Sequence, residues 1–205
     1  MFHPSKVKKA QQLHTTFVFY LTSTISKYFQ YLYFMKSQSE ILQIINSYHE
    51  MGEPALAGAF VIEEFGLAQP NFLGFEFREK ADPSYILMTT EGTFGAPQII
   101  RIPENAFEFP FPLIINLIAH EMLHVIQKAT ATMVSDKNER EWQAYCEMLF
   151  HHHFPLVPEC SDYHKKFFAS KAIEYYNRMG EGSELQQKYA QQKLEVENLV
   201  ASLSE

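Results

Sequence analysis

Two histidines and a glutamate with helical spacing are the residues of this sequence best suited to chemistry. His120 and His124 are four positions apart, and Glu121 follows the first histidine directly. Residues four apart on a helix share one face, so both imidazoles can reach one Zn²⁺ at about 2.0–2.1 Å. The offset of Glu121 brings its carboxylate to a water at the metal, where it can act as general base. The pattern predicts one zinc ion per chain and hydrolysis by a metal-activated water.

The segment that carries this pattern is apolar, which strengthens the metal interpretation. Residues 113–119 are almost entirely aliphatic, and we expect them to begin a buried helix over 113–129. Placing two histidines and a glutamate in a buried helix costs desolvation energy unless they are paired or bound to a metal. A surface helix that carries the three residues by chance is the alternative.

A third ligand should come from a later element, because catalytic zinc usually has three protein ligands and one open position. Glu139, Glu141 and Glu147 all lie on the next predicted helix, over 136–153. Glu141 shares its side of that helix with Ala144, whose small side chain allows a close approach to the motif helix. We therefore predict Glu141 as the third ligand, with a solvated surface carboxylate as the other interpretation.

A run of three histidines at 151–153 and two cysteines are further candidates for chemistry. Consecutive residues point in different directions on a helix, so the run makes a poor single metal site. We interpret it as a favourable charge arrangement at a helix C-terminus, although one of the three could replace Glu141 as a ligand. Cys146 is better explained as a buried core residue than as a catalytic thiol.

The motif helix followed by Glu-x-x-Ala-Tyr at 141–145 resembles the zincin metallopeptidases whose third ligand is glutamate. The short spacing is most similar to the compact cytoplasmic members, including those that cleave phage-type repressors. The resemblance covers about residues 85–150. It implies a hydrolase, a zinc metallopeptidase acting on a protein or peptide substrate. A zincin-like domain that binds or regulates, with little or no proteolysis, is the alternative.

The resemblance also implies roles for individual residues. His120, His124 and Glu141 correspond to the zinc ligands, and Glu121 corresponds to the catalytic base. In that family a sheet edge beside the motif helix holds the extended substrate by strand addition, and the matching segments here are 85–90 or 98–102.

A residue that would stabilise the oxyanion is not recognisable from the motif. Tyr145 and His164 are catalytic candidates by position, together with Tyr163.

The elements that must position these residues indicate a mixed α+β, mostly helical fold. We expect a zincin-like core with three to four strands packed on the motif helix, flanked by N- and C-terminal helices. A single domain is predicted over 1–205, with a helical part at 1–70, the sheet, motif helix and ligand helix at 71–153, and a helical part at 154–205. The remaining helices are predicted at 4–35, 39–50, 54–65, 161–179 and 183–203, and the strands at 72–77, 85–90 and 98–102.

Composition excludes some partners and suggests a compartment. The net charge of −7 offers no electrostatic reason to expect nucleic acid. Two cysteines are too few for a disulfide scaffold. The apolar stretch 15–25 lacks a small-residue cleavage site and is too short to cross a bilayer. We expect a cytoplasmic protein without membrane contact, and the oligomeric state stays open.

Overall fold

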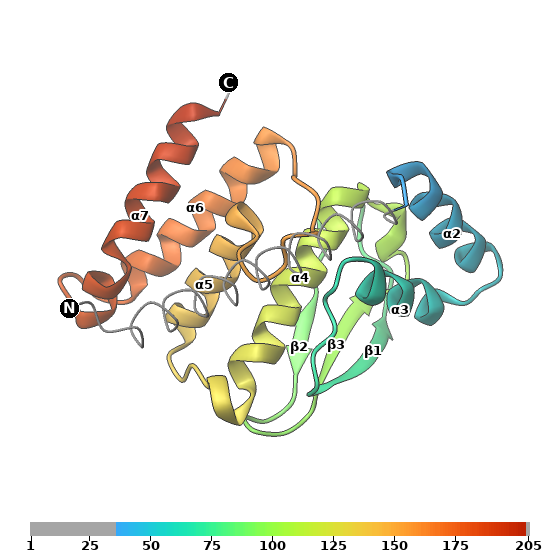
Figure 1. Cartoon of the computed structure of the whole chain (residues 1–205), viewed down its shortest axis with the longest axis horizontal. Coiled ribbons are helices and arrows are strands. Elements are labelled where there is room, and N and C mark those ends of the chain that lie inside the picture. Colours follow the sequence, from blue (N-terminus) through green and yellow to red (C-terminus); the bar gives the residue numbers. More distant parts are fainter. Residues whose placement is uncertain (1–35, 204–205) are drawn as a thin grey trace, which may run out of the picture. The chain divides into compact units, whose positions relative to one another are not determined.

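The structure is a computed structural model that describes residues 36–203 (Figure 1). The chain divides into two compact units, residues 1–43 and 44–205, and the site and its supporting elements all lie in the second. Six α-helices and a three-stranded sheet form within the described residues. Their bounds are α2 Gln38–Glu50, α3 Pro54–Glu64, β1 Phe72–Arg78, β2 Thr89–Glu91, β3 Gln98–Pro103, α4 Phe111–Lys128, α5 Lys137–Phe150, α6 Asp162–Arg178 and α7 Glu184–Ser202.

These elements confirm the predicted mixed α+β, mostly helical fold. Every helix predicted after residue 36 is present, with ends within a few residues of those expected. The helix predicted over 4–35 lies outside the described residues, and the prediction of one domain over 1–205 stays a prediction. No helix of the described part of the chain is long and apolar enough to cross a membrane.

The strand predicted over 85–90 is wrong in its first half. A tight turn ends at its first residue: Tyr85 N donates to Asp82 O at 3.0 Å, and the Asp82 carboxylate accepts from the backbone and hydroxyl of Ser84. Residues 86–88 belong to no strand, and the chain is paired only from β2, Thr89–Glu91. Turn chemistry therefore accounts for Tyr85 alone.

The sheet has the order β1-β3-β2, so β3 is the central strand. β2 pairs antiparallel with β3, as the hairpin-like sequence predicts, whereas β1 pairs parallel with β3, which was not predicted. The buried Gln98 amide donates to Thr93 O and Ala96 O and thereby holds the connection between β2 and β3. Gly92 in this connection has φ +137°, and a Cβ there would lie 2.7 Å from the Gln98 side chain. The result is a hairpin whose strand β2 forms an edge of the sheet.

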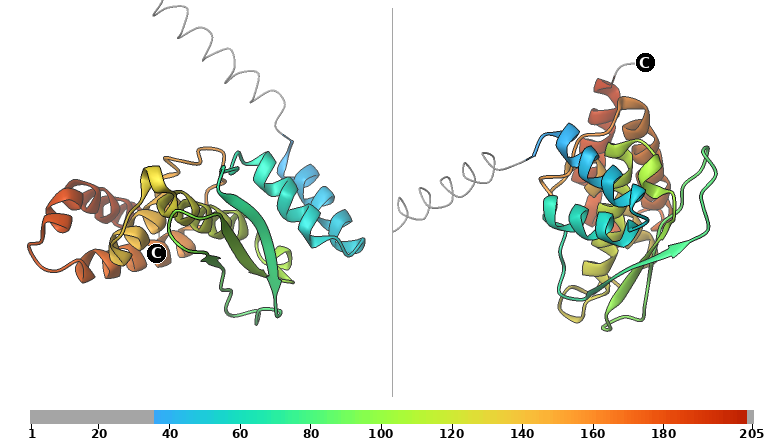
Figure 2. Two further views of the ribbon diagram at one scale, coloured as in Figure 1. Left: turned by 90° about the horizontal axis from the view of Figure 1, so that it is seen from below. Right: turned by 90° about the vertical axis from the view of Figure 1, so that its right-hand side faces the viewer.

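Helix α4, which carries the motif, lies between the sheet and α5 (Figures 1 and 2). It packs against β2 and β3, which confirms the predicted sheet on the motif helix. Pro112 stands in its first turn, where the missing N–H costs nothing. Its aliphatic residues Ile114, Ile115 and Ile118 are almost fully buried, so the helix is an internal one.

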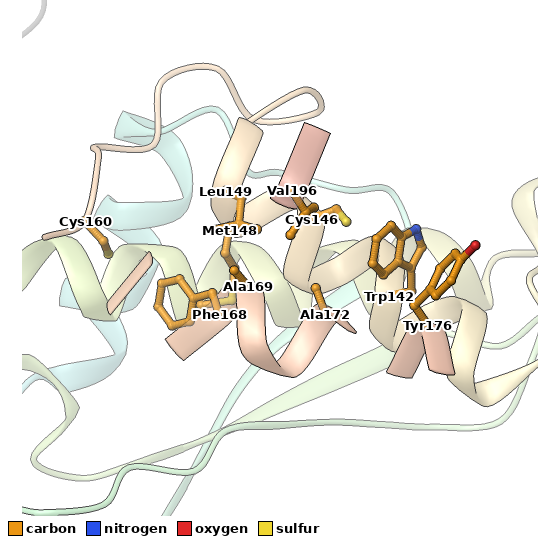
Figure 3. Close-up of a cluster of buried hydrophobic side chains, with 10 residues drawn as sticks. All are labelled: Trp142, Cys146, Met148, Leu149, Cys160, Phe168, Ala169, Ala172, Tyr176 and Val196. Atoms are coloured by element: carbon orange, nitrogen blue, oxygen red, sulfur yellow. The ribbon is translucent and has the colours of Figure 1, made fainter. Parts of the chain in front are cut away.

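The C-terminal helices α5, α6 and α7 enclose their own hydrophobic cluster (Figure 3). Each begins with a side-chain cap of a residue type that favours this position: Asp136 accepts from Glu139 N, Ser161 from His164 N and Ser183 from Gln186 N. The cluster consists of Trp142, Cys146, Met148, Leu149, Cys160, Phe168, Ala169, Ala172, Tyr176 and Val196. Through this packing, α6 and α7 hold α5 in place beside α4.

Candidate metal centre

The side chains of His120, His124 and Glu141 meet at one point between α4 and α5. The Nε2 atoms of the two histidines lie 3.2 Å apart. One Glu141 carboxylate oxygen lies 3.6 Å from His120 Nε2, and the other lies 3.7 Å from His124 Nε2. Both histidines are buried, and Glu141 is partly buried. The structure therefore brings together the three residues that the sequence predicted as ligands.

The spacing of these three donors suits a small tetrahedral cation. Bonds of about 2.0–2.1 Å at tetrahedral angles place neighbouring ligand atoms about 3.3–3.4 Å apart. The two Nε2 atoms, 3.2 Å apart, lie close to that value, and a different Glu141 oxygen lies 3.6 or 3.7 Å from each of them; one ligand atom from each of the three residues falls within 4.8 Å of the others. Two imidazoles and one carboxylate also match the donor preference of Zn²⁺.

The orientation of His124 is set by a hydrogen bond on its other ring nitrogen. Its Nδ1 lies 2.7 Å from Gln127 Oε1. The Gln127 amide cannot be flipped, because its Nε2 donates to the backbone carbonyl of Arg140 at 3.0 Å, and a carbonyl only accepts. Gln127 Oε1 must therefore accept from His124 Nδ1–H, which leaves the Nε2 lone pair directed at the candidate site.

This hydrogen bond is the first of a hydrogen-bond chain that connects His124 to α7. Gln127 Nε2 donates to Gln143 Oε1 at 2.8 Å, and Gln143 Nε2 donates to the Tyr189 hydroxyl at 2.5 Å. The Tyr189 hydroxyl donates in turn to the buried Glu139 carboxylate at 2.7 Å, which Lys188 also contacts. Every donor in the chain points away from His124 toward a negative charge, so the bonds polarise one another and strengthen the imidazole as a donor to a metal.

His120 is held differently, by ring packing. Its ring lies edge-on to the Tyr145 ring, with centroids 4.7 Å apart, and Tyr145 stacks on Tyr175 of α6. His120 Nδ1 is buried and has no hydrogen-bond partner among the described residues. The two histidines therefore differ in how firmly their tautomer is set.

Glu121 lies beside the donors, with its carboxylate held by a neighbouring strand. The Thr90 hydroxyl of β2 contacts Glu121 Oε2 and the Glu121 backbone carbonyl, both at 2.8 Å. Glu121 is buried, yet it lines the same cavity as the two histidines. The contact leaves Oε1 of the carboxylate available to accept a proton from a water in that cavity.

The electrostatics of the group favour a positive charge between the three donors. Burial alone would raise the pKa of Glu141, but hydrogen bonds and attraction from His120 and His124 outweigh it and hold that pKa far below its usual range. For His124, burial lowers the pKa, while Glu141 and the charge of Glu121 raise it to a greater extent. Both directions indicate a site that attracts a cation.

A cavity of about 340 Å³ opens on the candidate metal centre. Residues of β2 and the segment before it, Leu87, Met88, Thr89 and Thr90, form one wall. Tyr145 and Tyr175 lie in the wall contributed by α5 and α6. Burial, with the nearby Glu141 charge, raises the pKa of Tyr145 above its ordinary value, so its hydroxyl stays protonated and can donate.

His164 is not brought to the cavity. Its Nδ1 lies 2.9 Å from the Ser161 hydroxyl at the start of α6, and its ring lies against Tyr163 and Phe168. Tyr163 is highly exposed. Of the oxyanion candidates named from the sequence, only Tyr145 lies at the site.

The other predicted alternatives have structural roles. Glu139 accepts the last hydrogen bond of the hydrogen-bond chain that begins at His124. The Glu147 carboxylate accepts three hydrogen bonds from the N–H groups of His153 and Phe154. The metal-capable group found within residues 36–203 contains none of the three histidines at 151–153. His151 contacts Asn116 Oδ1 through Nε2 at 2.9 Å and lies outside that group.

Both cysteines are buried and unpaired, as predicted for Cys146. Burial raises the pKa of Cys146 well above its ordinary value and that of Cys160 to about 12. Such thiols stay protonated near neutral pH, which confirms that Cys146 is a core residue and not an activated nucleophile.

Sequence reasoning missed Thr90, Gln127, Tyr175 and the basic residues of the cavity. Gln127 carried one usable signal, because it lies three positions after His124 and therefore one turn further along the same helix. Thr90 and Tyr175 lie on elements far away in the chain, so only the tertiary structure could place them.

Comparison with family models, curated proteins and solved structures gives no significant match for this chain. The function must therefore be inferred from the chemistry of the site itself.

Proposed function

We propose that the protein is a zinc-dependent metallopeptidase with a zincin-like core. The observation that carries the proposal is the convergence of His120, His124 and Glu141 on one point, with Glu121 beside them in an open cavity. Three protein donors leave a fourth tetrahedral position free, which is the arrangement of catalytic and not of structural zinc sites. One ion per chain would be held.

A zinc ion in this position supplies a Lewis acid that acidifies a water and polarises a carbonyl. Glu121 accepts a proton from the attacking water through its free oxygen and delivers it to the leaving amine. Thr90 keeps the Glu121 carboxylate turned toward the cavity during both transfers. Tyr145, whose hydroxyl stays protonated, can donate a hydrogen bond to the oxygen on which negative charge develops.

An extended peptide would bind along β2. This strand lies at the edge of the sheet, and two of its residues, Thr89 and Thr90, line the cavity. The other segment suggested by the sequence, 98–102, forms β3, which is paired on both sides and offers no free edge. Strand addition on β2 would carry a substrate past the three donors.

The first test is metal content. Purified, tag-free protein should contain or take up about one zinc ion per chain, measured by elemental mass spectrometry after dialysis. Protein that contains no zinc and takes up none from buffered zinc solutions would end both the peptidase proposal and the alternative of a zincin-like binding domain.

The second test separates catalysis from binding. Glu121→Gln should retain the metal and lower the rate of peptide cleavage by about 10²–10⁴-fold, since it removes the proton acceptor. Glu181→Gln, the same change in an exposed loop between α6 and α7, is the matched control and should keep full activity. A zinc-loaded Glu121→Gln enzyme with an unchanged rate would refute the assignment of the base. A wild-type protein that binds zinc and peptides but cleaves none would support the binding domain instead.

A further inference from the structure

The cavity at the candidate metal centre has three basic side chains in its lining, Lys128, Lys137 and Arg140. The motif chemistry uses none of them. They come from the end of α4 and the first turn of α5, two helices that pack against one another. Such an arrangement is unusual for a protein whose overall net charge is −7.

Lys128 is partly buried next to the proposed base. Its Nζ donates to Thr90 O at 2.7 Å, so the ammonium group is fixed at the β2 wall and keeps two further protons. Burial and the charge of Arg140 lower the pKa of Lys128, and Glu121 and Glu91 counteract this only in part. The two cations are thus close enough to repel one another inside the cavity.

Arg140 and Lys137 extend the positive surface outward. Arg140 Nη1 donates to Val134 O and Ser135 O, and its guanidinium lies over the Phe94 ring at 5.0 Å from the centroid. These contacts use both protons of Nη1 and hold the guanidinium rigidly. The hydrogen bonds found among residues 36–203 do not involve its Nε and Nη2 atoms. Lys137 is exposed in the first turn of α5 and has no ion-pair partner within residues 36–203.

The nearby carboxylates do not neutralise these cations. Glu121 and Glu141 are the two acidic residues of the cavity lining, and both belong to the proposed metal centre, whose ion would add two positive charges. Glu91 lies 3.4 Å from Arg101 and is paired there. The cavity therefore carries an excess of positive charge that a negatively charged group of the substrate would compensate.

We propose that Lys128, Lys137 and Arg140 form a subsite for a carboxylate group of the substrate, next to the bond that is cleaved. This inference rests on the proposed function, because an unmodified peptide offers negative charge only as carboxylate. The carboxylate belongs either to an acidic side chain or to the free C-terminus. In both cases it would receive charge-assisted hydrogen bonds from the remaining protons of the three cations.

The test uses four pools of random octapeptides that carry a neutral fluorophore at the N-terminus. One central position is fixed as Glu or Gln, and the C-terminus is free or amidated. Binding is measured by fluorescence anisotropy on the full-length Glu121→Gln protein with added zinc, so that no peptide is consumed. We expect at least one pool with the additional carboxylate to bind about 10-fold more tightly than the Gln, amidated pool. Tighter binding of the pool with central Glu and an amidated C-terminus would identify an acidic side chain as the ligand. Tighter binding of the pool with central Gln and a free C-terminus would identify the C-terminal carboxylate.

Two variants and a control link the preference to the subsite. Lys137→Glu, placed in a helix first turn that tolerates acidic residues, should abolish most of the preference, and Lys128→Met should reduce it. Lys80→Glu makes the same charge change at an exposed residue outside the cavity lining and should leave the preference intact. The preference should also weaken between about 0.05 and 0.5 M NaCl, as expected for partly exposed charges.

Equal binding of all four pools, or no binding of any, would overturn the subsite. So would a preference that survives both cavity substitutions unchanged. Failure of the proposed function has a different signature: the carboxylate preference persists, but the wild-type protein cleaves none of the pools.

Discussion

Replacing Gln127 with methionine should weaken zinc binding although Gln127 would not touch the ion. The substitution keeps the length of a side chain that is only 2% exposed, so it opens little space. It removes the acceptor of the bond from His124 Nδ1 and both donors, to Arg140 O and Gln143 Oε1. His124 would then lose the partner that sets its tautomer and connects it to Glu139.

The size of the effect follows from these bonds. Loss of the partner of a metal-bound histidine costs about 10–100-fold in metal affinity, which corresponds to about 1.4–2.7 kcal/mol. The Gln143 Oε1 atom left without its donor costs about 1–3 kcal/mol more, and this part lowers the stability of the fold as a whole, whereas Arg140 O, inside α5, keeps its helical hydrogen bond from Ala144 N. Zinc affinity and stability must therefore be measured separately.

Zinc affinity is measured by competition with a chromophoric chelator on folded protein, and stability by urea unfolding of the metal-free protein. Gln98→Met is the matched control, because Gln98 is fully buried and donates two hydrogen bonds of similar length, to Thr93 O and Ala96 O. It should lower stability and leave zinc affinity unchanged. Wild-type zinc affinity in folded Gln127→Met would refute the role of the hydrogen-bond chain.

Three further predictions concern Glu121, the third ligand and pH. Thr90→Val should lower kcat about 10-fold with zinc content unchanged, because Glu121 loses the hydroxyl that orients its carboxylate. Thr90→Ser, which keeps a hydroxyl, should retain the wild-type kcat. A loss of zinc from Thr90→Val would contradict a positioning role. Glu141→Ala should weaken zinc binding by more than the roughly 100-fold that loss of a ligand's hydrogen-bond partner can cost. Glu147→Ala is the control and should lower only the stability of the fold. Equal zinc affinities of the two variants would remove Glu141 from the ligands. Burial lowers the pKa of His151, so between that value and about 6.5 the unfolded chain binds more protons than the folded protein. The free energy of unfolding should therefore fall as pH drops through this window. His151→Asn suits the left-handed backbone at this position and should flatten the dependence of that free energy on pH, measured by urea unfolding at several pH values. An unchanged pH dependence would contradict this origin.

Most of the helical framework could be predicted because its signals are local. The caps at Asp136, Ser161 and Ser183 and the proline in the first turn of α4 are recognisable from residue type and spacing alone. The first half of the strand predicted over 85–90 was wrong because the turn at Asp82 takes Tyr85 and because residues 86–88, although β-prone, find no partner strand. The parallel pairing of β1 with β3 was missed because strand order depends on contacts between distant segments.

In the site, residue spacing alone identified which side chains of one helix can act together. The four-residue spacing of His120 and His124 puts both on one face wherever the helix lies, and the face shared by Glu141 and Ala144 singled out one glutamate of three. Both inferences needed only helical geometry, which relates neighbouring residues without reference to the rest of the fold; the three side chains lie together, and their role as ligands stays a prediction.

The residues that surround that face could be identified only from the packing of the folded chain. It brought Thr90 from the sheet to Glu121, linked Gln127 to α7 through Gln143 and Tyr189, and gathered three cations around the cavity. It also separated His164 from the site. The physical reason is that these placements depend on how helices and strands far apart in the chain pack and exclude water, and residue spacing contains no information about that packing.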